Sequence, residues 1–197
     1  MAGPPFVGLT GGIGAGKSEA LAALERLGAA TISADKVVHD LYEDPEVRAA
    51  VVERWGEEVA PEGRVDRSRV ARAAFATDAD RNWLESLIWP RVAQRIGEWR
   101  AAESAREPAP PALVVETPLL FEAGLQDNYD ATIAIVADEA IRAERARARG
   151  HEALDERTAR QLSQAEKAQR ATYAVENSGS LRELEQELSG VLAKLKS

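Results

Sequence analysis

The sequence contains no cysteine and only two histidines among its 197 residues. The absence of cysteine excludes disulfides, thiolate zinc sites and thiol nucleophiles, and His39 and His151 are too few for a histidine-rich metal site. Lysine and arginine number 25 against 33 aspartates and glutamates, which gives a formal net charge of −8. Because nucleic-acid surfaces are basic, this balance argues against nucleic-acid binding. An anionic ligand would have to be held by local positive charge.

Long apolar runs are also missing. No stretch approaches the roughly 18 consecutive apolar residues of a membrane helix, and the first five residues lack the basic start of a signal peptide. We therefore expect a cytoplasmic protein with no membrane partner. The 197 residues are 45% hydrophobic, which suits one α/β domain with a small inserted subdomain.

Residues 11–18 read GGIGAGKS and fit the phosphate-binding pattern G-x-x-x-x-G-K-[ST]. They follow a short apolar run at residues 6–9, so a strand, a glycine-rich loop and a helix start are expected in that order. Such a loop points successive backbone N–H groups at phosphate oxygens, and the helix dipole adds positive potential. Lys17 would reach the β- and γ-phosphates, and Ser18 would ligate Mg²⁺. The sequence predicts a mononucleotide site.

The spacing of apolar residues predicts alternating strands and helices along the rest of the chain. Strands are expected at residues 6–9, 29–32, 112–115, 131–136 and 173–175, and helices at 17–27, 35–42, 45–55, 138–149, 155–170 and 181–195. This alternation predicts an α/β protein with the three-layer α/β/α P-loop NTPase fold and a five-stranded parallel sheet.

Residues 66–106 are helical by composition, with Asp66 and Asp78 as N-cap candidates and Pro90 dividing two helices. We interpret residues 45–106 as a helical insertion on the substrate side of a core formed by about residues 1–44 and 112–197. The proline-rich residues 107–111 form a stiff connector back to the sheet.

A glycine-rich phosphate loop alone indicates only that a nucleoside triphosphate binds. No aspartate is followed three positions later by glycine and no Asn-Lys pair occurs, so the usual GTPase elements are missing. A phosphoryl-transfer enzyme needs a carboxylate near the acceptor, carboxylates near the metal and mobile positive charge. The chain offers Asp35 at the end of the second strand, Glu116 at the end of the third, and one helix face with Arg142, Arg145 and Arg149.

Several further motifs occur along the chain, namely LTGGIGAGKS at residues 9–18, the Ala34-Asp35 pair, PLLFE at 118–122, the arginines Arg145 and Arg149, the spacing of Arg157, Gln161 and Lys167, and NSGS at 177–180. Through these motifs the chain resembles the dephospho-CoA kinase family nearly end to end. This resemblance implies transfer of the γ-phosphate of ATP to the 3′-hydroxyl of dephospho-CoA, which completes coenzyme A. It also implies a helical CoA-side domain and a lid at about residues 145–170.

The same resemblance implies roles for individual residues. Asp35 would be the general base, and Lys17 and Arg145 would also be catalytic. ATP would be bound by Gly12, Ile13, Gly14, Ala15, Gly16, Lys17, Ser18, Glu19, Arg145, Arg149, Asn177 and Gly179. Dephospho-CoA would contact Thr10, Asp35, Leu119, Leu120, Phe121 and Glu122, and Mg²⁺ would be held by Ser18 and Glu116.

Each of these residues has a plainer interpretation. Asp35 could cap a helix, Glu116 could be a solvated charge at a strand end, residues 118–121 could be core, and the arginines could form a solvated face. Other functions also stay open, namely another small-molecule or nucleoside monophosphate kinase, or a regulatory ATPase without an acceptor. We expect a small-molecule partner, no nucleic acid, and a monomer or weak homo-oligomer.

Overall fold

The computed structural model describes residues 3–148 and 161–195. The chain divides into two compact units, of which the first comprises Met1–Ser33 and Arg100–Ser197 and the second Ala34–Trp99. The expected lid at about residues 145–170 lies partly outside the described residues and stays a prediction.

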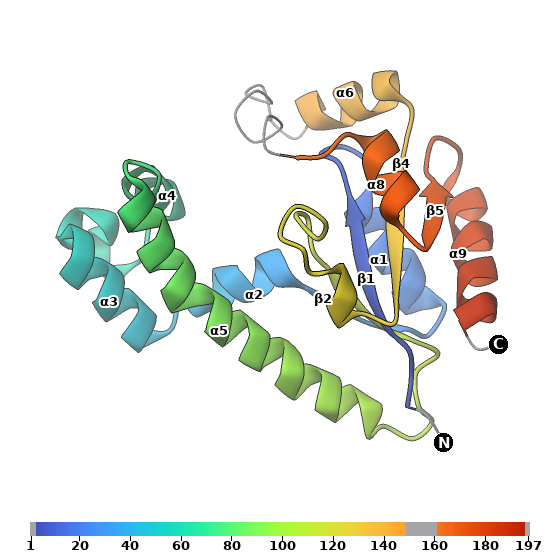
Figure 1. The fold of residues 1–197 in the computed structure, drawn as a ribbon, viewed down its shortest axis with the longest axis horizontal. Coiled ribbons are helices and arrows are strands. Elements are labelled where there is room, and N and C mark those ends of the chain that lie inside the picture. Colours follow the sequence, from blue (N-terminus) through green and yellow to red (C-terminus); the bar gives the residue numbers. More distant parts are fainter. Residues whose placement is uncertain (1–2, 149–160, 196–197) are drawn as a thin grey trace. The chain divides into compact units, whose positions relative to one another are not determined.

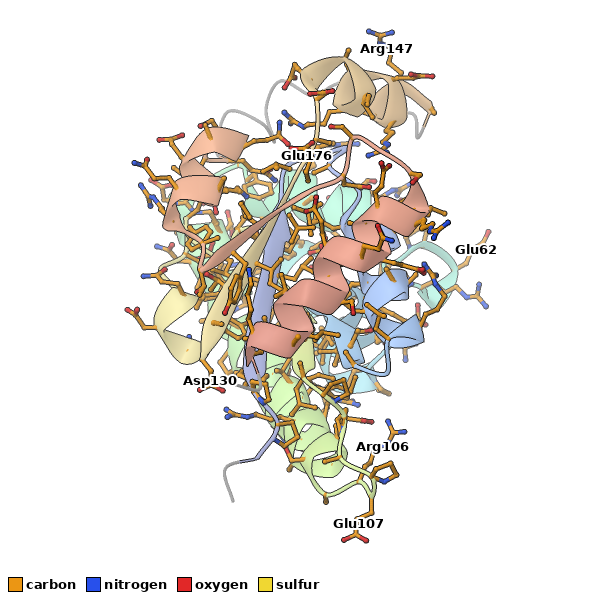
Figure 2. All side chains as sticks on the ribbon, turned by 90° about the vertical axis from the view of Figure 1, so that its right-hand side faces the viewer. Glu62, Arg106, Glu107, Asp130, Arg147 and Glu176 are labelled. Carbon is orange, nitrogen blue, oxygen red and sulfur yellow. The ribbon has the colours of Figure 1, made fainter. Side chains whose placement is uncertain are left out.

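The first unit is built on a five-stranded, wholly parallel sheet in the order β2-β3-β1-β4-β5 (Figure 1). The strands are β1 (Phe6–Gly11), β2 (Ala30–Ser33), β3 (Leu113–Glu116), β4 (Ala131–Val136) and β5 (Tyr173–Glu176). The three central strands are almost continuously apolar because both of their faces are covered. In Figure 2, Glu176 marks the carboxyl end of β5, and Asp130, just before β4, lies at the opposite end of the sheet. The predicted α/β sheet is confirmed.

Helices cover both faces of this sheet. Along β1, Val7 and Leu9 belong to a core cluster with α1 (Lys17–Arg26) and α9 (Leu181–Leu195), for example with Leu24 and Leu188. Gly8 faces the other way, where an added Cβ would lie 2.5 Å from Leu120 and 2.8 Å from Tyr129. This second face is covered by the turns that follow β3 and by α8 (Gln164–Arg170), which packs on β4. The remaining elements are α6 (Glu139–Ala148) and the short 3-10 helix Gln126–Asn128.

The second unit is helical and consists of α2 (Ala34–Leu41), α3 (Pro45–Trp55), two 3-10 turns (Glu57–Val59 and Pro61–Gly63), α4 (Arg67–Ala74) and α5 (Asp78–Ser104), the last of which runs on into the first unit. Asp66 caps α4 as predicted, accepting bonds from the backbone N–H groups of Ser68 and Arg69. The N-cap of α5 is Thr77 and not Asp78, because the Thr77 hydroxyl accepts the backbone N–H of Asp80 at 3.0 Å. Each capping side chain accepts one or more backbone N–H groups that would otherwise be unpaired at the start of the helix.

Pro90 does not divide two helices, so that prediction is wrong. Helix α5 continues through it for 27 residues. Proline removes one backbone donor and crowds the preceding turn, and inside a helix it can produce a kink without ending the helix. In that preceding turn the Arg91 guanidinium donates to the Leu87 carbonyl oxygen at 2.8 Å.

The helix predicted at residues 155–170 is also corrected in its described part. Residues 161–163 are not helical, and α8 begins at Gln164. Ser163 and Glu166 form a capping box, in which each side chain accepts a backbone N–H of the other residue. The Ser-x-x-Glu spacing was a start signal that the apolar periodicity concealed.

Asp80 should make the stability of the protein depend on acidity. Its carboxylate accepts from the Thr77 hydroxyl and from the side chains of Arg54 and Trp55, and these contacts, above all the Thr77 hydrogen bond, lower its pKa. A carboxyl whose pKa falls on folding stabilises the protein above its unfolded pKa, and this contribution is lost as the pH drops through the folded value. We expect Asp80→Asn to lower the thermal midpoint at about pH 7 and to matter much less at about pH 3.

Thermal unfolding followed by circular dichroism at both pH values measures this difference. The matched control is Asp78→Asn, because Asp78 lies two residues away in the first turn of α5 and its side chain is 87% exposed. A destabilisation of the Asp80 variant that is the same at both pH values would contradict the expectation.

Candidate active site at the end of the central strand

The glycine-rich loop lies at the carboxyl end of β1, between Gly11 and the start of α1 at Lys17. Gly14 and Gly16 have φ values of 77° and 90°, in the left-handed region that glycine adopts without steric cost. Gly16 is the N-cap of α1, and as a glycine it has no side chain with which to cap that end of the helix. Backbone N–H groups at an uncapped helix start can receive an anion. The conformation therefore suits phosphate binding.

Close packing is a second reason for glycine in this loop. A Cβ on Gly14 would collide with the carbonyl oxygen of Arg142, and one on Gly16 would collide with the side-chain amide of Asn177. That amide belongs to a residue that is only 2% exposed, and it donates to the Ala15 carbonyl oxygen at 2.8 Å. Asn177, expected beside the nucleotide, thus supports the loop directly.

Lys17 folds back over the loop. Its ammonium donates to the carbonyl oxygens of Gly11 at 3.1 Å and Gly12 at 3.4 Å. The neighbouring Ser18 is exposed at the start of α1, and Glu19 is half-buried in the same turn. The positive charge expected at the phosphate site is therefore present at the loop itself.

Glu116 ends β3 at the same edge of the sheet. It pairs in register with Leu9 of β1 and with Ser33 of β2, and the Ser33 hydroxyl donates to its carboxylate at 2.5 Å. The residue is 8% exposed. Within residues 3–148 and 161–195 no three histidine, aspartate or glutamate side chains form a metal-binding group. Mg²⁺ needs only one or two protein oxygens besides substrate phosphates, so a hydroxyl at Ser18 and a carboxylate at Glu116 fit it.

The arginine face of α6 contacts the loop region through two residues. Arg145 donates to the Asn177 carbonyl oxygen at 3.0 Å, and Arg142 donates to the Ile13 carbonyl oxygen at 3.0 Å. Arg142 was expected only as a member of this face, and its contact with the loop was missed. Its spacing of three residues from Arg145 was the available signal. Arg149 lies outside the described residues.

The PLLFE segment after β3 is mostly internal. Thr10 is fully buried and donates to the Pro118 carbonyl oxygen at 3.1 Å, and Leu120 and Phe121 are buried as well. Glu122 accepts the backbone N–H of Leu162 at 2.8 Å. Leu119 is 44% exposed. Among the residues expected to contact the acceptor in this segment, Leu119 therefore offers an apolar side chain to a ligand.

Asp35 belongs to the helical unit and is exposed. Helix α2 begins at Ala34, so Asp35 lies in the first turn of the helix. A carboxylate in that turn is favoured by the helix dipole. Asp35 is thus a solvent-accessible carboxylate two residues after Ser33, the last residue of β2.

No helix in the described part of the chain combines the length and apolarity needed to cross a membrane.

Comparisons with known proteins bear on these features. The family model for dephospho-CoA kinase matches residues 5–183. A dephospho-CoA kinase of Deinococcus radiodurans is 38% identical over 195 residues, which cover 98% of this chain and 93% of that protein. A crystal structure from Thermus thermophilus has a TM-score of 0.82 at 32% identity over the whole of both chains. Dephospho-CoA kinase from Campylobacter jejuni has a TM-score of 0.68 at 26% identity over 96% of each chain. The chain belongs to the dephospho-CoA kinase family.

Proposed function

We propose that Asp35 is the general base and residues 11–18 are the triphosphate cradle with which this protein makes coenzyme A. As a dephospho-CoA kinase, the protein transfers the γ-phosphate of ATP to the 3′-hydroxyl of dephospho-CoA, giving CoA and ADP. The observation that carries the proposed site is the loop itself, with two left-handed glycines, an uncapped helix start and Lys17 at the end of the central strand. Open parallel sheets bind their ligands at this edge.

In phosphoryl transfer the protein mainly positions the two substrates and stabilises the negative charge of the transferring group. Lys17 would exchange its two carbonyl partners for phosphate oxygens, because Coulomb attraction draws an ammonium more strongly to an anionic oxygen than to a neutral carbonyl oxygen. Arg145 is held near the loop by its hydrogen bond to the Asn177 carbonyl oxygen. Its guanidinium would stabilise the negative charge on the phosphoryl group during transfer. Asp35 would accept the proton of the 3′-hydroxyl as the oxygen attacks phosphorus.

Mg²⁺ would be held by the Ser18 hydroxyl and the Glu116 carboxylate. When bound, it neutralises charge on the β- and γ-phosphate oxygens. The hydrogen bond from Ser33 fixes the orientation of the Glu116 carboxylate, and such outer contacts are typical supports of a metal ligand.

On the acceptor side, we propose that Leu119 contacts dephospho-CoA while Thr10, Leu120, Phe121 and Glu122 hold the segment in place. This division follows their exposure and hydrogen bonds. A cytoplasmic location and a monomeric or weakly oligomeric state stay predictions from the sequence.

The reaction is tested by ADP release from the purified protein with ATP and Mg²⁺, comparing dephospho-CoA with AMP, CMP, adenosine and no acceptor. We expect release to be stimulated by dephospho-CoA alone, with CoA formed in equal amount. Stimulation by a monophosphate would overturn the acceptor and keep the fold. Slow release that is indifferent to every acceptor would favour a regulatory ATPase.

A further inference from the structure

Arg142 lies against the phosphate-binding loop and not in solvent. Its side chain is 13% exposed, its Nε donates to the Ile13 carbonyl oxygen at 3.0 Å, and its Nη1 pairs with Glu139 at 2.6 Å. Glu139 is itself 81% exposed at the start of α6. An exposed carboxylate contributes little to holding such a pair. The hydrogen bond to the Ile13 carbonyl oxygen therefore does more than the ion pair with Glu139 to position the Arg142 guanidinium.

The same residue shapes the positions on either side of Ile13. A Cβ on Gly12 would lie 2.9 Å from Nη2 of Arg142, and one on Gly14 would collide with the Arg142 carbonyl oxygen. Residues 12, 13 and 14 thus all pack against a single residue of α6. Glycine at 12 and 14 serves this approach as well as the approach of phosphate.

A hydrogen bond to the Ile13 carbonyl fixes more than one atom. The carbonyl of Ile13 and the N–H of Gly14 belong to one planar, trans peptide and point in opposite directions. A donor that holds the carbonyl outward therefore aims the Gly14 N–H inward, where a phosphate cradle needs its donors.

Asn177 does the same for another peptide of the loop. Its amide holds the Ala15 carbonyl oxygen at 2.8 Å, which fixes the direction of the Gly16 N–H. Arg145 donates to the backbone carbonyl of Asn177 at 3.0 Å, so both supports are tied to helix α6. Two alternate peptides of the cradle are thus held from outside by side chains that follow β4 and β5.

We propose that Arg142 is a positioning residue for ATP, which orients the peptide between Ile13 and Gly14 and makes the shape of the cradle depend on helix α6. The inference deepens the proposed function and rests on residues 11–18 binding the triphosphate. Arg142 acts through the loop and is not itself assigned a contact with phosphate, because its Nε is engaged by a carbonyl and its Nη1 by a carboxylate. Its effect should therefore fall on ATP and not on the acceptor.

Two substitutions separate the hydrogen bond from the charge. Arg142→Met keeps much of the length and removes every donor, whereas Arg142→Gln restores an N–H donor without a charge. We expect Arg142→Met to weaken ATP binding about tenfold and to raise the KM for ATP similarly, as loss of one oriented hydrogen bond and of the loop order would do. Arg142→Gln should recover most of this loss, and the KM for dephospho-CoA should stay unchanged in both.

Binding of ATP alone is measured by titration calorimetry on the full chain, and the kinetic constants by ADP release. Glu139→Gln is the matched control, because it removes the ion pair and leaves the Ile13 bond, so ATP binding should not change. Arg142→Ala provides a second truncation if Arg142→Met does not fold.

Three results would overturn the inference. The first is unchanged ATP binding by the truncated variants, and the second is an equal rise in KM for both substrates. The third is an Arg142→Gln variant that binds ATP as weakly as Arg142→Met, which would mean that the charged Arg142 guanidinium binds phosphate directly. Because ATP binding is measured without acceptor, a failure of CoA formation in the unsubstituted protein would count against the proposed function and leave this test intact.

Discussion

Replacing Asp35 with asparagine is expected to lower kcat for CoA formation by about 10²- to 10⁴-fold while ATP binding stays nearly unchanged. Asparagine has the shape of aspartate and is nearly as good at a helix start, so a purely structural role in α2 would survive the substitution. It cannot accept the proton of the 3′-hydroxyl. The substitution therefore separates the proposed base from the plainer interpretation as a helix cap.

The rate is measured as ADP release at saturating ATP and dephospho-CoA, and ATP binding by calorimetry. Asp40→Asn is a fitting control, since Asp40 is an exposed aspartate on the same helix and should tolerate the change. A parallel loss of rate and of ATP binding in Asp35→Asn would remove the base assignment. Equal rates for the two variants would also do so.

The elements that the sequence predicted well are those set by local rules. The order of strand, loop and helix around residues 11–18 follows from backbone conformations that only glycine adopts cheaply, and the structure has both left-handed glycines there. Strands β1, β3 and β4 can be recognised in the sequence as apolar runs because they are buried on both faces. Their parallel pairing then follows from the helices between them.

Two element boundaries were predicted wrongly because one local signal was used where the structure follows another. Pro90 predicts a helix break, but α5 continues through it with Arg91 donating to a carbonyl of the preceding turn. The start of α8 depends on the reciprocal cap of Ser163 and Glu166, which apolar spacing does not reveal.

The contacts of the candidate site are less predictable still, because they join residues far apart in the chain. Arg142 and Ile13 are 129 positions apart, and Asn177 and Ala15 are 162 apart. The sequence shows that an arginine face and an asparagine turn exist, but only the sheet order brings both beside the loop. Likewise, the sequence shows that Glu122 is a charge within the PLLFE segment, but it does not show that Lys167 is buried and pairs with it.

Lys167→Met is expected to be the most destabilising single substitution considered for this protein. The lysine side chain is 1% exposed, and its ammonium donates to the Pro118 carbonyl oxygen at 2.7 Å and lies 3.0 Å from a carboxylate oxygen of Glu122. The other oxygen of Glu122 is buried without a hydrogen-bond partner among the described residues. Removing the lysine leaves this carboxylate uncompensated, at a cost of about 3–5 kcal/mol. For a chain of this length the thermal midpoint should fall by roughly 10 °C.

The double variant Lys167→Met with Glu122→Gln distinguishes a lost charge partner from lost packing. If the cost is the buried charge of Glu122, removing that charge should return a large part of the stability, because replacing both members of a buried pair is often nearly neutral. Arg170→Met, an exposed cation on the same helix, should change the midpoint little. Urea unfolding of the unsubstituted protein, of the single variants Lys167→Met and Glu122→Gln, and of the double variant gives the coupling free energy. Additive losses from Lys167→Met and Glu122→Gln would mean that the two side chains stabilise the protein separately, and that Lys167 supports the PLLFE segment through the Pro118 carbonyl alone.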